Sequence, residues 1–343
     1  MNEIPPVFVF STGRCGSTMV SQMLNRHPDI LSLSEFFSAV GLSAFAGKKV
    51  TGEHMWRLYS KPGKRAEIIK RESFSELLYP FDDPASRFDA ATLPPIMSVA
   101  LPHLTDHYEA LYDELERFVH AQPKAWPRDH YQALFTWLGE RLGKKVWIER
   151  HGGSLLMASR LLRQFPEARV IHVFRDGRET TLSMSHHPPF RVALTLIRRA
   201  RRRGIDLYRI LEKTQNSDRL TCWMAAVQWW GLDLDRALSE SLPLPEFAEF
   251  WSNMIETGHR AFGHFGPDRR LDLRFEEMQE DPQREARRLL EFISPELGNE
   301  TWLDEVARIP RPTPSKFAQL DPGMQQAVTQ ACRPGLQRLG YTC

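Results

Sequence analysis

The sequence predicts an α/β fold in which a parallel β-sheet is flanked by helices and interrupted by helical insertions. Three segments support this prediction. An apolar run at residues 7–11 ends in a glycine-containing turn and then in residues spaced as on a helix. Residues 144–174 have the pattern of a strand, a helix and a second strand, and residues 271–275 form a further short strand before a helix. This alternation is typical of parallel sheets with right-handed crossovers.

The turn after the first strand has the composition of an anion site. Its glycines let the backbone curl without Cβ clashes, its arginine adds a formal charge, and its hydroxyl groups can donate hydrogen bonds. The dipole of the following helix also favours an anion there. The residues concerned are Gly13, Arg14, Cys15, Gly16, Ser17 and Thr18. We therefore predict a phosphate-like ligand, the alternative being an ordinary strand–turn–helix.

The cysteine inside this turn has two interpretations. Cys15 is either a thiolate favoured by Arg14 and the helix N-terminus, or a small filler that points into the core.

A second strand and a first insertion follow. Ile30, Leu31 and Leu33 predict a short extended stretch that ends at Ser34 and Glu35. Residues 38–95 are predicted to be a mobile, partly helical cover, and two amphipathic helices follow within the same insertion, 38–143. Their apolar stripes are Tyr108, Leu111, Leu115 and Phe118, and Tyr131, Leu134, Phe135, Leu138 and Leu142.

Residues 144–148 and 169–174 are predicted strands, with a helix over residues 155–165 between them. Ligands of parallel sheets bind at the carboxyl ends of the strands. We therefore expect the first turn to meet the ionisable side chains that follow the other strands. These side chains are Glu35, Glu149, Arg150 and Arg175.

The segment after the strand at 169–174 is a second candidate anion site. Asp176 can cap a helix that carries Ser183 two turns beyond Arg175. A dianionic phosphate favours a bidentate guanidinium, and the serine hydroxyl adds a donor. The alternative is that Arg175 pairs with Asp176 or another nearby carboxylate.

Residues 186–268 interrupt the alternation and form a second predicted insertion. The basic run Arg198–Arg203 is interpreted either as a solvated helix face or as an entrance for an anionic glycan, lipid head group or membrane surface. Four tryptophans are predicted to be mostly core, although one or two could line an acceptor pocket. They are Trp223, Trp229, Trp230 and Trp251.

The strand at 271–275 leads to a further helix. Asp281 is its predicted N-cap and Pro282 its first residue, with Leu289, Leu290 and Ile293 on the buried side.

Composition limits the function classes. The net charge of +2 over 343 residues argues against a dedicated nucleic-acid binder. The four cysteines form no CxxC pair, which suits a reducing compartment. The sequence has no apolar run of about eighteen residues, so no membrane span is predicted. The N-terminal segment MNEIPP leads into the first strand too early for a signal peptide. A cytoplasmic location is expected.

The chain resembles sulfotransferases that use 3′-phosphoadenosine 5′-phosphosulfate (PAPS), most of all their bacterial carbohydrate- or tyrosyl-type branch. Four segments in family order carry the resemblance, at residues 7–37, 144–185, 271–293 and 313–341. They include VFVFSTGRCGST, RDGRETTLS, RFEEMQEDP and PTPSKF. The first turn departs from the Walker pattern, which needs a lysine directly before the hydroxyl residue.

The resemblance implies one P-loop-like sulfotransferase domain over residues 1–343. Its nucleotide-binding core would comprise about 5–37, 144–185 and 271–343, and the insertions 38–143 and 186–268 would cover the acceptor site. It implies transfer of a sulfuryl group from PAPS to a hydroxyl or amine, with adenosine 3′,5′-bisphosphate as product and without a metal.

The resemblance also implies individual roles. The first turn would hold the 5′-phosphate, Arg175 and Ser183 the 3′-phosphate, and Ser315 and Lys316 would close over the nucleotide. Arg14 would stabilise the leaving phosphate. Glu35 would be the general base, with His151 as the second candidate; alternatively, Glu35 is an ion-pair partner of Arg150 or Arg14.

Two other functions are considered. A P-loop small-molecule kinase would need Mg²⁺ and a Walker lysine, and a nucleotide-binding protein with a decayed site would not retain the full set of residues. The acceptor is expected to be a small molecule, glycan or lipid, with no nucleic-acid partner and with peripheral membrane contact possible through Arg198–Arg203. The oligomeric state is not predicted.

Overall fold

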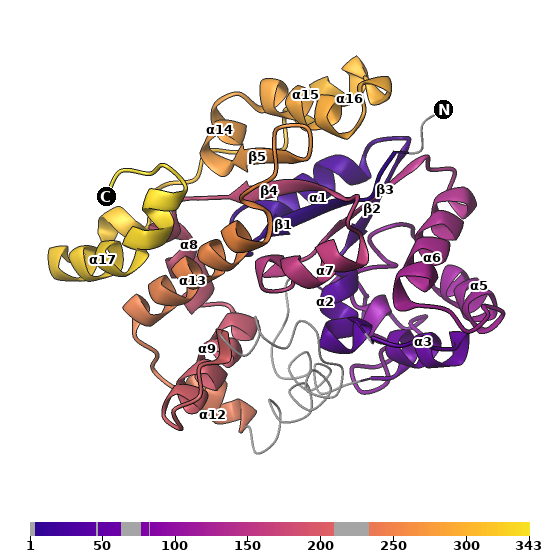
Figure 1. Ribbon diagram of the computed structural model, residues 1–343, viewed down its shortest axis with the longest axis horizontal. Helices are drawn as coiled ribbons and strands as arrows, with labels where there is room; N and C mark the ends of the chain where they lie inside the picture. The colour runs from indigo at the N-terminus through magenta and orange to yellow at the C-terminus, as the bar shows by residue number, and fades with distance from the viewer. Residues whose placement is uncertain (1–3, 46, 63–76, 82, 209–232) are drawn as a thin grey trace. The chain divides into compact units, whose positions relative to one another are not determined.

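The computed structural model describes residues 4–45, 47–62, 77–81, 83–208 and 233–343 (Figure 1). The chain divides into two compact units. The first comprises Met1–His27, His151–Lys213 and Leu232–Cys343, and the second comprises Pro28–Arg150 and Thr214–Gly231. The predictions for Trp223, Trp229 and Trp230 lie outside the described residues.

Three parallel strands form the sheet of the first unit. β1 (Val7–Ser11) pairs with β4 (Arg169–Phe174), and β4 also pairs with β5 (Arg270–Arg274). The register aligns Val7 with Arg169. All three predicted strands are confirmed.

Helices and short 3₁₀ turns connect and flank these strands (Figure 1). They are α1 (Ser17–Asn25), η3 (Ser154–Leu156), α7 (Ala158–Gln164), α8 (Gly177–Ser185), α9 (Pro188–Arg201), α12 (Leu234–Ser239), α13 (Leu244–Phe262), α14 (Phe275–Glu280), α15 (Pro282–Ile293), η5 (Pro295–Leu297), α16 (Glu300–Val306), η6 (Phe317–Gln319) and α17 (Pro322–Arg338).

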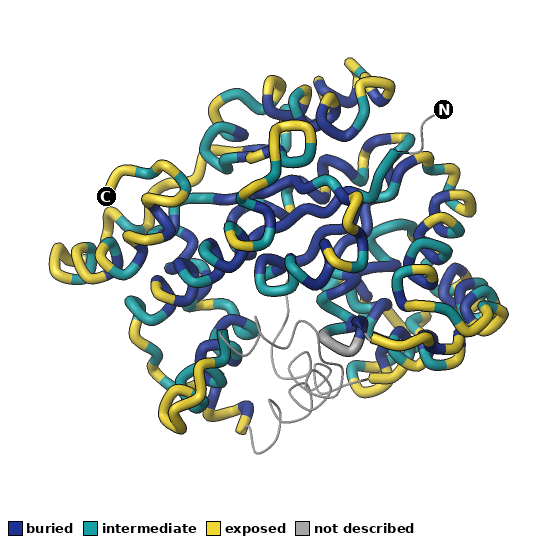
Figure 2. Tube along the Cα trace, in the orientation of Figure 1, coloured by how far each residue is buried: buried dark blue, intermediate teal, exposed yellow. Residues whose placement is uncertain are grey.

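The core of the first unit is built on β1, every residue of which is buried (Figure 2). Phe8 and Phe10 point to the same face because side chains alternate along a strand. The ring of Phe8 lies 5.3 Å from that of Phe165, at the end of α7, and Phe10 stacks on Phe262 of α13 at 5.5 Å. α7 and α13 therefore cover this face of the sheet.

The second unit contains the parallel pair β2 (Ile30–Ser34) and β3 (Val146–Arg150), which aligns Ile30 with Val146. Its remaining elements are α2 (Phe36–Val40), η1 (Gly41–Phe45), α3 (Gly52–Ser60), η2 (Pro95–Met97), α5 (Tyr108–His120) and α6 (Pro127–Arg141). The two predicted amphipathic helices are α5 and α6. The predicted strand at 144–148 begins two residues later.

An aromatic cluster holds the second unit together. Phe37 meets Tyr131 edge-on at 4.9 Å, and Phe36 meets Phe135 in the same way at 5.0 Å. Edge-to-face pairs of this kind are favourable because the positive ring edge meets the negative ring face. The cluster fixes α2, and with it the end of β2, against α6.

Both predicted helix caps are confirmed. The Asp176 side chain accepts a hydrogen bond from the N–H of Arg178, and Asp281 accepts one from Arg284. The helix predicted over residues 155–165 is instead a 3₁₀ turn followed by α7, with the break at Met157. No described helix has the length and apolar character needed to cross a membrane.

Trp251 of α13 is a core residue with no exposed surface. A Cβ atom on Gly177 would lie 2.4 Å from its ring, and a Cβ on Gly335 would lie 2.5 Å from it. α8 and α17 can approach α13 this closely because both positions lack a side chain.

Candidate active site

The turn between β1 and α1 has an unusual backbone. Gly13, Arg14 and Gly16 have φ angles of 77°, 58° and 88°. Glycine adopts this left-handed region without strain, whereas an arginine there is uncommon. Gly16 is the N-cap of α1 and has no side chain with which to cap that helix.

Both glycines of the turn are also required for space. A Cβ on Gly13 would lie 2.7 Å from the ring of Phe190, and a Cβ on Gly16 would lie 2.3 Å from the ring of Phe275. The turn is thus packed against α9 and α14 by two aromatic rings.

Hydrogen bonds hold the turn on the end of the sheet. The N–H of Ser11 donates to Ser154 Oγ at 2.9 Å, and the N–H of Gly13 donates to Ser11 Oγ at 3.2 Å. Cys15 is fully buried, and its thiol donates to the carbonyl of Val173 at 3.3 Å. This geometry favours the interpretation of Cys15 as a filler whose side chain points inward.

Arg14 joins the turn to α8. Its Nε donates to Ser183 Oγ at 3.1 Å. The two segments that the sequence singled out as anion sites therefore meet within the first unit. Ser17 is buried at the start of α1, and Thr18 is exposed.

Arg175 follows β4 directly and is largely enclosed, with 15% of its side chain exposed. Its guanidinium lies over the ring of Phe275 at 4.8 Å. The carboxylate of Glu179, in the first turn of α8, lies 3.8 Å from Arg175 Nη2. Asp176, the partner considered from the sequence, instead pairs with Arg178 at 2.6 Å.

The C-terminal residues Ser315 and Lys316 are brought to the same helix. Ser315 Oγ donates to Glu179 Oε1 at 2.5 Å, and the N–H of Lys316 donates to Glu179 Oε2 at 3.2 Å. From the sequence, the alternative for Arg175 was a pair with Asp176 or another nearby carboxylate, and Glu179 was not singled out. Its spacing of four residues from Arg175 was the signal that could have identified it.

Glu35 follows β2 in the second unit. Its φ angle is 58°, and its carboxylate accepts a hydrogen bond from Arg150 Nη1 at 2.8 Å. The Arg150 side chain is only 6% exposed, whereas that of Glu35 is 22% exposed. The ion pair considered from the sequence is therefore present with Arg150, and the carboxylate keeps a solvent-facing side.

Glu149 has a structural position beside this pair. It is buried, and its carboxylate accepts a hydrogen bond from the N–H of Phe37 at 3.2 Å. His151, the second candidate base, is 2% exposed in the first unit.

Arg14 and Glu35 share a distinctive property. Within the described ranges they are the two non-glycine residues with a positive φ angle. Such strain of about 1–3 kcal/mol persists where the surrounding structure imposes it, and it is concentrated at functional sites.

Part of the basic run on α9 is paired within the protein. Arg198 lies 3.0 Å from Glu240 and 3.2 Å from Glu246, and Arg201 lies 3.5 Å from Glu249. Arg202 and Arg203 are exposed. In the part of the chain that the structure describes, no group of three or more His, Cys, Asp or Glu side chains could hold a metal ion.

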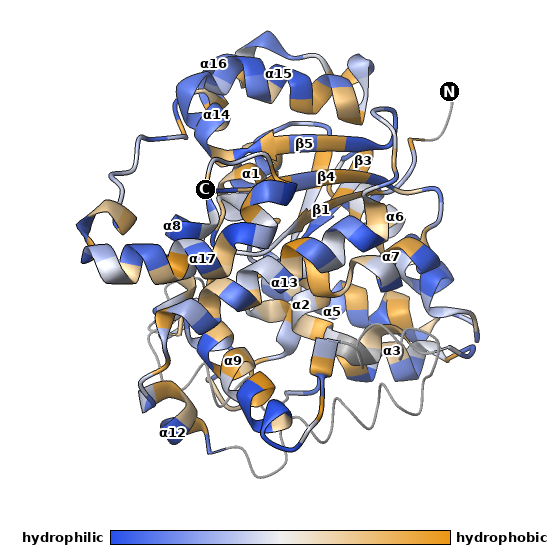
Figure 3. Cartoon of the chain, turned by 60° about the vertical axis from the view of Figure 1, so that its left-hand side comes forward, coloured by the Kyte–Doolittle hydropathy of each residue, from blue (hydrophilic) through white to orange (hydrophobic). Residues whose placement is uncertain are grey.

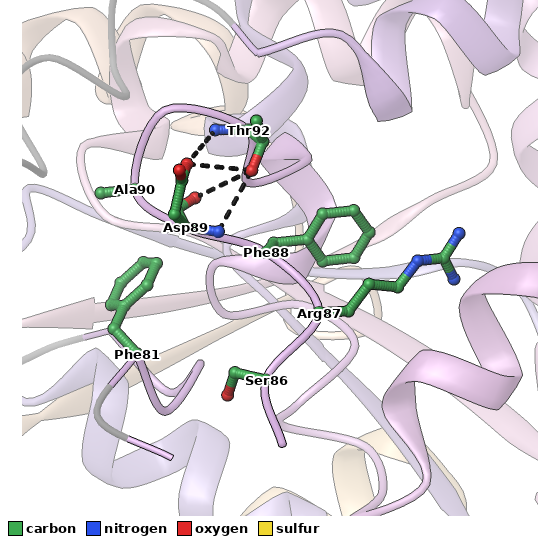
Figure 4. A pocket seen from close by; sticks show the side chains of 7 residues that line it. All are labelled: Phe81, Ser86, Arg87, Phe88, Asp89, Ala90 and Thr92. Atoms are coloured by element: carbon green, nitrogen blue, oxygen red, sulfur yellow. Dashed lines mark hydrogen bonds between the residues drawn. The ribbon is translucent and has the colours of Figure 1, made fainter. Parts of the chain in front are cut away.

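A surface hollow of about 380 Å³ lies in the second unit, between Phe81 and Thr92. Figure 4 shows Asp89 and Thr92 joined by hydrogen bonds at its edge. Arg87, which also lines it, pairs with Asp113 at 2.6 Å. Asp89, Thr92 and Arg87 are thus bonded within the protein, and none of the predicted site residues lines the hollow.

Comparison with protein families identifies the class of the protein. The model of the sulfotransferase family matches residues 5–216, which is more than half of the chain. The chain therefore belongs to the sulfotransferase family and is a sulfotransferase enzyme. Sulfotransferases of this family generally use PAPS.

Solved structures similar to the chain include three sulfotransferases. One is the sulfotransferase domain of the Synechococcus PCC 7002 olefin synthase, with 15% identity, a TM-score of 0.45, and coverage of 100% of this chain and 97% of that chain. The domain from the curacin biosynthetic pathway has 14% identity, a TM-score of 0.47 and coverage of 99% of both chains. Sulfotransferase STF9 from Mycobacterium avium has 17% identity, a TM-score of 0.46, and coverage of 100% of this chain and 78% of that chain. Comparison with curated proteins finds no match.

Proposed function

We propose that this sulfotransferase transfers a sulfuryl group from PAPS to a hydroxyl or amine of its acceptor. The observation that carries the proposal is the hydrogen bond of 3.1 Å between Arg14 Nε and Ser183 Oγ. It joins a phosphate-type turn to the helix that follows Arg175. A nucleotide with separate 5′ and 3′ phosphate groups needs two such anion sites close together.

The residues of the first unit fit this nucleotide. The turn from Gly13 to Thr18 supplies backbone N–H groups, hydroxyls and the N-terminal end of the α1 dipole for the 5′-phosphosulfate. Arg175 and Ser183 supply a guanidinium and a hydroxyl for the 3′-phosphate. The Phe275 ring behind Arg175 orients the guanidinium without neutralising it.

Arg14 stabilises the charge that develops on the departing phosphate. Bound PAPS supplies an activated sulfuryl group. The leaving group is the 5′-phosphate of adenosine 3′,5′-bisphosphate. A guanidinium stabilises negative charge and is not a proton donor in proteins. A fixed cation in a partly enclosed turn is effective in this role because it needs no reorganisation during the reaction.

Glu35 is the proposed general base, which takes the proton from the acceptor hydroxyl or amine. Arg150, 2.8 Å away, holds the carboxylate in position. The exposed side of Glu35 leaves the carboxylate accessible, whereas His151 is 2% exposed. This difference in exposure supports Glu35 over His151 as the base.

A labelled-donor assay tests the proposed function. The purified protein is incubated with PAPS carrying radioactive sulfur and with fractionated cell extract, and labelled products are identified by mass spectrometry. We expect transfer of the label and release of adenosine 3′,5′-bisphosphate, with no loss of activity when a chelator is added. Transfer of a phosphoryl group from ATP with Mg²⁺, without transfer from PAPS, would contradict the proposal and favour a kinase.

A further inference from the structure

A largely exposed connection links α16 to α17 (Figure 3). We call its residues 311–319 the strap. At one end, Gln279 of α14 donates hydrogen bonds to the carbonyl of Arg311 and to Thr313 Oγ1. At the other end, the strap is held by α8. It therefore runs between the two helices that flank Arg175.

One carboxylate, that of Glu179, holds the α8 end of the strap. Ser315 Oγ donates to Oε1 at 2.5 Å, and the N–H of Phe317 donates to the same oxygen at 3.0 Å. The N–H of Lys316 donates to Oε2 at 3.2 Å. Hydrogen bonds to an ionised acceptor are stronger than bonds between neutral groups. The Phe317 ring also lies 5.5 Å from the Arg178 guanidinium.

The same carboxylate faces the proposed 3′-phosphate site. Glu179 Oε2 lies 3.8 Å from Arg175 Nη2, and both side chains are about 85% enclosed, with 14% and 15% exposed. Glu179 thus connects the guanidinium to the strap through one side chain.

The two contacts of Glu179 have opposite effects on an incoming phosphate. A negative charge beside Arg175 lowers the positive potential there, so the charge alone disfavours a dianion. The hydrogen bonds from the strap order Ser315 and Lys316, which the proposed function places over the nucleotide. The sign of the change in nucleotide affinity on removing Glu179 therefore tells which effect prevails.

We propose that Glu179 is a positioning residue that docks the strap beside Arg175 and thereby raises the affinity for the nucleotide. The proposal rests on the proposed function for the identity of the nucleotide. The docking step itself involves only residues of the chain, so it can be measured without any ligand.

Limited trypsin digestion of the full-length protein measures docking. Trypsin cleaves after lysine and arginine but poorly before proline, so Arg311–Pro312 resists and Lys316–Phe317 is the cleavable bond of the strap. We expect Glu179→Ala to speed cleavage at Lys316 about tenfold, the effect of losing hydrogen bonds to a charged group. Glu179→Gln keeps an acceptor oxygen, so its cleavage rate at Lys316 should lie between those of the wild-type protein and Glu179→Ala.

Glu300→Ala is the matched control. Glu300 is also an acidic residue in the first turn of a helix, and its carboxylate pairs with Arg287 at 2.7 Å rather than with the strap. We expect its cleavage rate at Lys316 to equal that of the wild-type protein. Equal rates for Glu179→Ala and the wild-type protein would overturn the docking role.

Calorimetric titration with adenosine 3′,5′-bisphosphate measures the second step. Glu179→Ala should bind about tenfold more weakly, and Ser315→Ala should weaken binding in the same direction without changing the charge. In turnover, the KM for PAPS should rise while kcat is retained. Tighter binding by Glu179→Ala would show that its charge prevails and would overturn the inference.

The outcomes separate the two proposals. Failure of the wild-type protein to bind the bisphosphate would contradict the proposed function. Normal wild-type binding with unchanged affinity in Glu179→Ala would overturn the role of Glu179 alone.

Discussion

Two strand-to-helix turns, one in each unit, are built alike and yet present opposite charges. β1 leads through Arg14 to α1, and β2 leads through Glu35 to α2. Arg14 and Glu35 each have a φ angle of 58°. The turns differ at the N-terminus of the helix that follows. In α2, the N–H of Phe37 already donates a hydrogen bond to the buried carboxylate of Glu149.

This difference indicates which turn can take a phosphate. The N-terminus of α2 holds an internal anion, so a second anion there would be repelled. The N-cap of α1 is a glycine, and the turn before it carries a positive charge. We infer that the first turn holds the donor nucleotide and that the second displays a carboxylate for proton transfer.

Replacement of the carboxylate in the second turn should have the largest effect. Glu35→Gln should lower kcat by a factor on the order of 10²–10⁴, the usual range for loss of a general base. The glutamine oxygen can still accept from Arg150, so the fold and the affinity for adenosine 3′,5′-bisphosphate should be retained. Steady-state kinetics and calorimetry measure the two quantities.

His151→Asn provides the comparison for this variant. If Glu35 is the base, His151→Asn should keep more activity than Glu35→Gln. Wild-type turnover by Glu35→Gln would show that Glu35 is only the ion-pair partner of Arg150 and would move the base to His151.

The two arginines at the start of α8 should separate nucleotide binding from packing. Arg175→Ala should weaken binding of the bisphosphate by about 10- to 100-fold, the effect of losing a hydrogen bond from a charged group to a phosphate. Arg178→Ala removes a side chain that is already paired with Asp176 at 2.6 Å, so its effect on binding should be smaller. Equal losses in calorimetric titration would contradict the assignment of Arg175.

Two glycines with positive φ angles test the packing of the first turn. Gly16→Ala places a Cβ 2.3 Å from the Phe275 ring, whereas Gly143→Ala, after α6, meets nothing within 4 Å. We expect the free energy of unfolding to fall by about 1 kcal/mol for Gly143→Ala, from backbone strain alone. Gly16→Ala should lose about 2–4 kcal/mol because overpacking adds to the strain. Denaturant titration would contradict this account if the two losses were equal.

Thiol labelling should show the smallest response. Cys15 and Cys332 are buried, and burial raises the pKa of the Cys332 thiol to about 12, which keeps it protonated. Cys343 is exposed. Alkylation followed by peptide mapping should label Cys343 quickly and Cys15 slowly, with or without nucleotide. Rapid labelling of Cys15 that nucleotide prevents would show instead a reactive thiolate in the turn.

The sequence was sufficient for the elements whose signals are local. The apolar run from Val7 to Ser11, the glycines of the first turn and the capping residue Asp176 each determine their own backbone, and all were predicted. The ends of β3 and the break at Met157 were missed because pairing and packing, rather than local preference, decide them.

The residues of the site were easier to predict than the pairs that they form with one another. Arg175 was identified, but Asp176 pairs with Arg178, and Glu179 faces Arg175 instead. The contact of Glu179 with Ser315 spans 136 residues, and no local pattern encodes such a contact. The roles of Ser315, Lys316 and the single-domain arrangement stay predictions.

The central claim is that the first turn and Arg175 hold a nucleotide with separate 5′ and 3′ phosphates. Calorimetric titration of the wild-type protein and Arg175→Ala with adenosine 3′,5′-bisphosphate and with adenosine 5′-monophosphate, without metal, tests it most directly. We predict that the wild-type protein prefers the bisphosphate and that Arg175→Ala loses this preference while still binding the monophosphate. Equal affinity of the wild-type protein for both nucleotides, or a preference that survives in Arg175→Ala, would contradict the account.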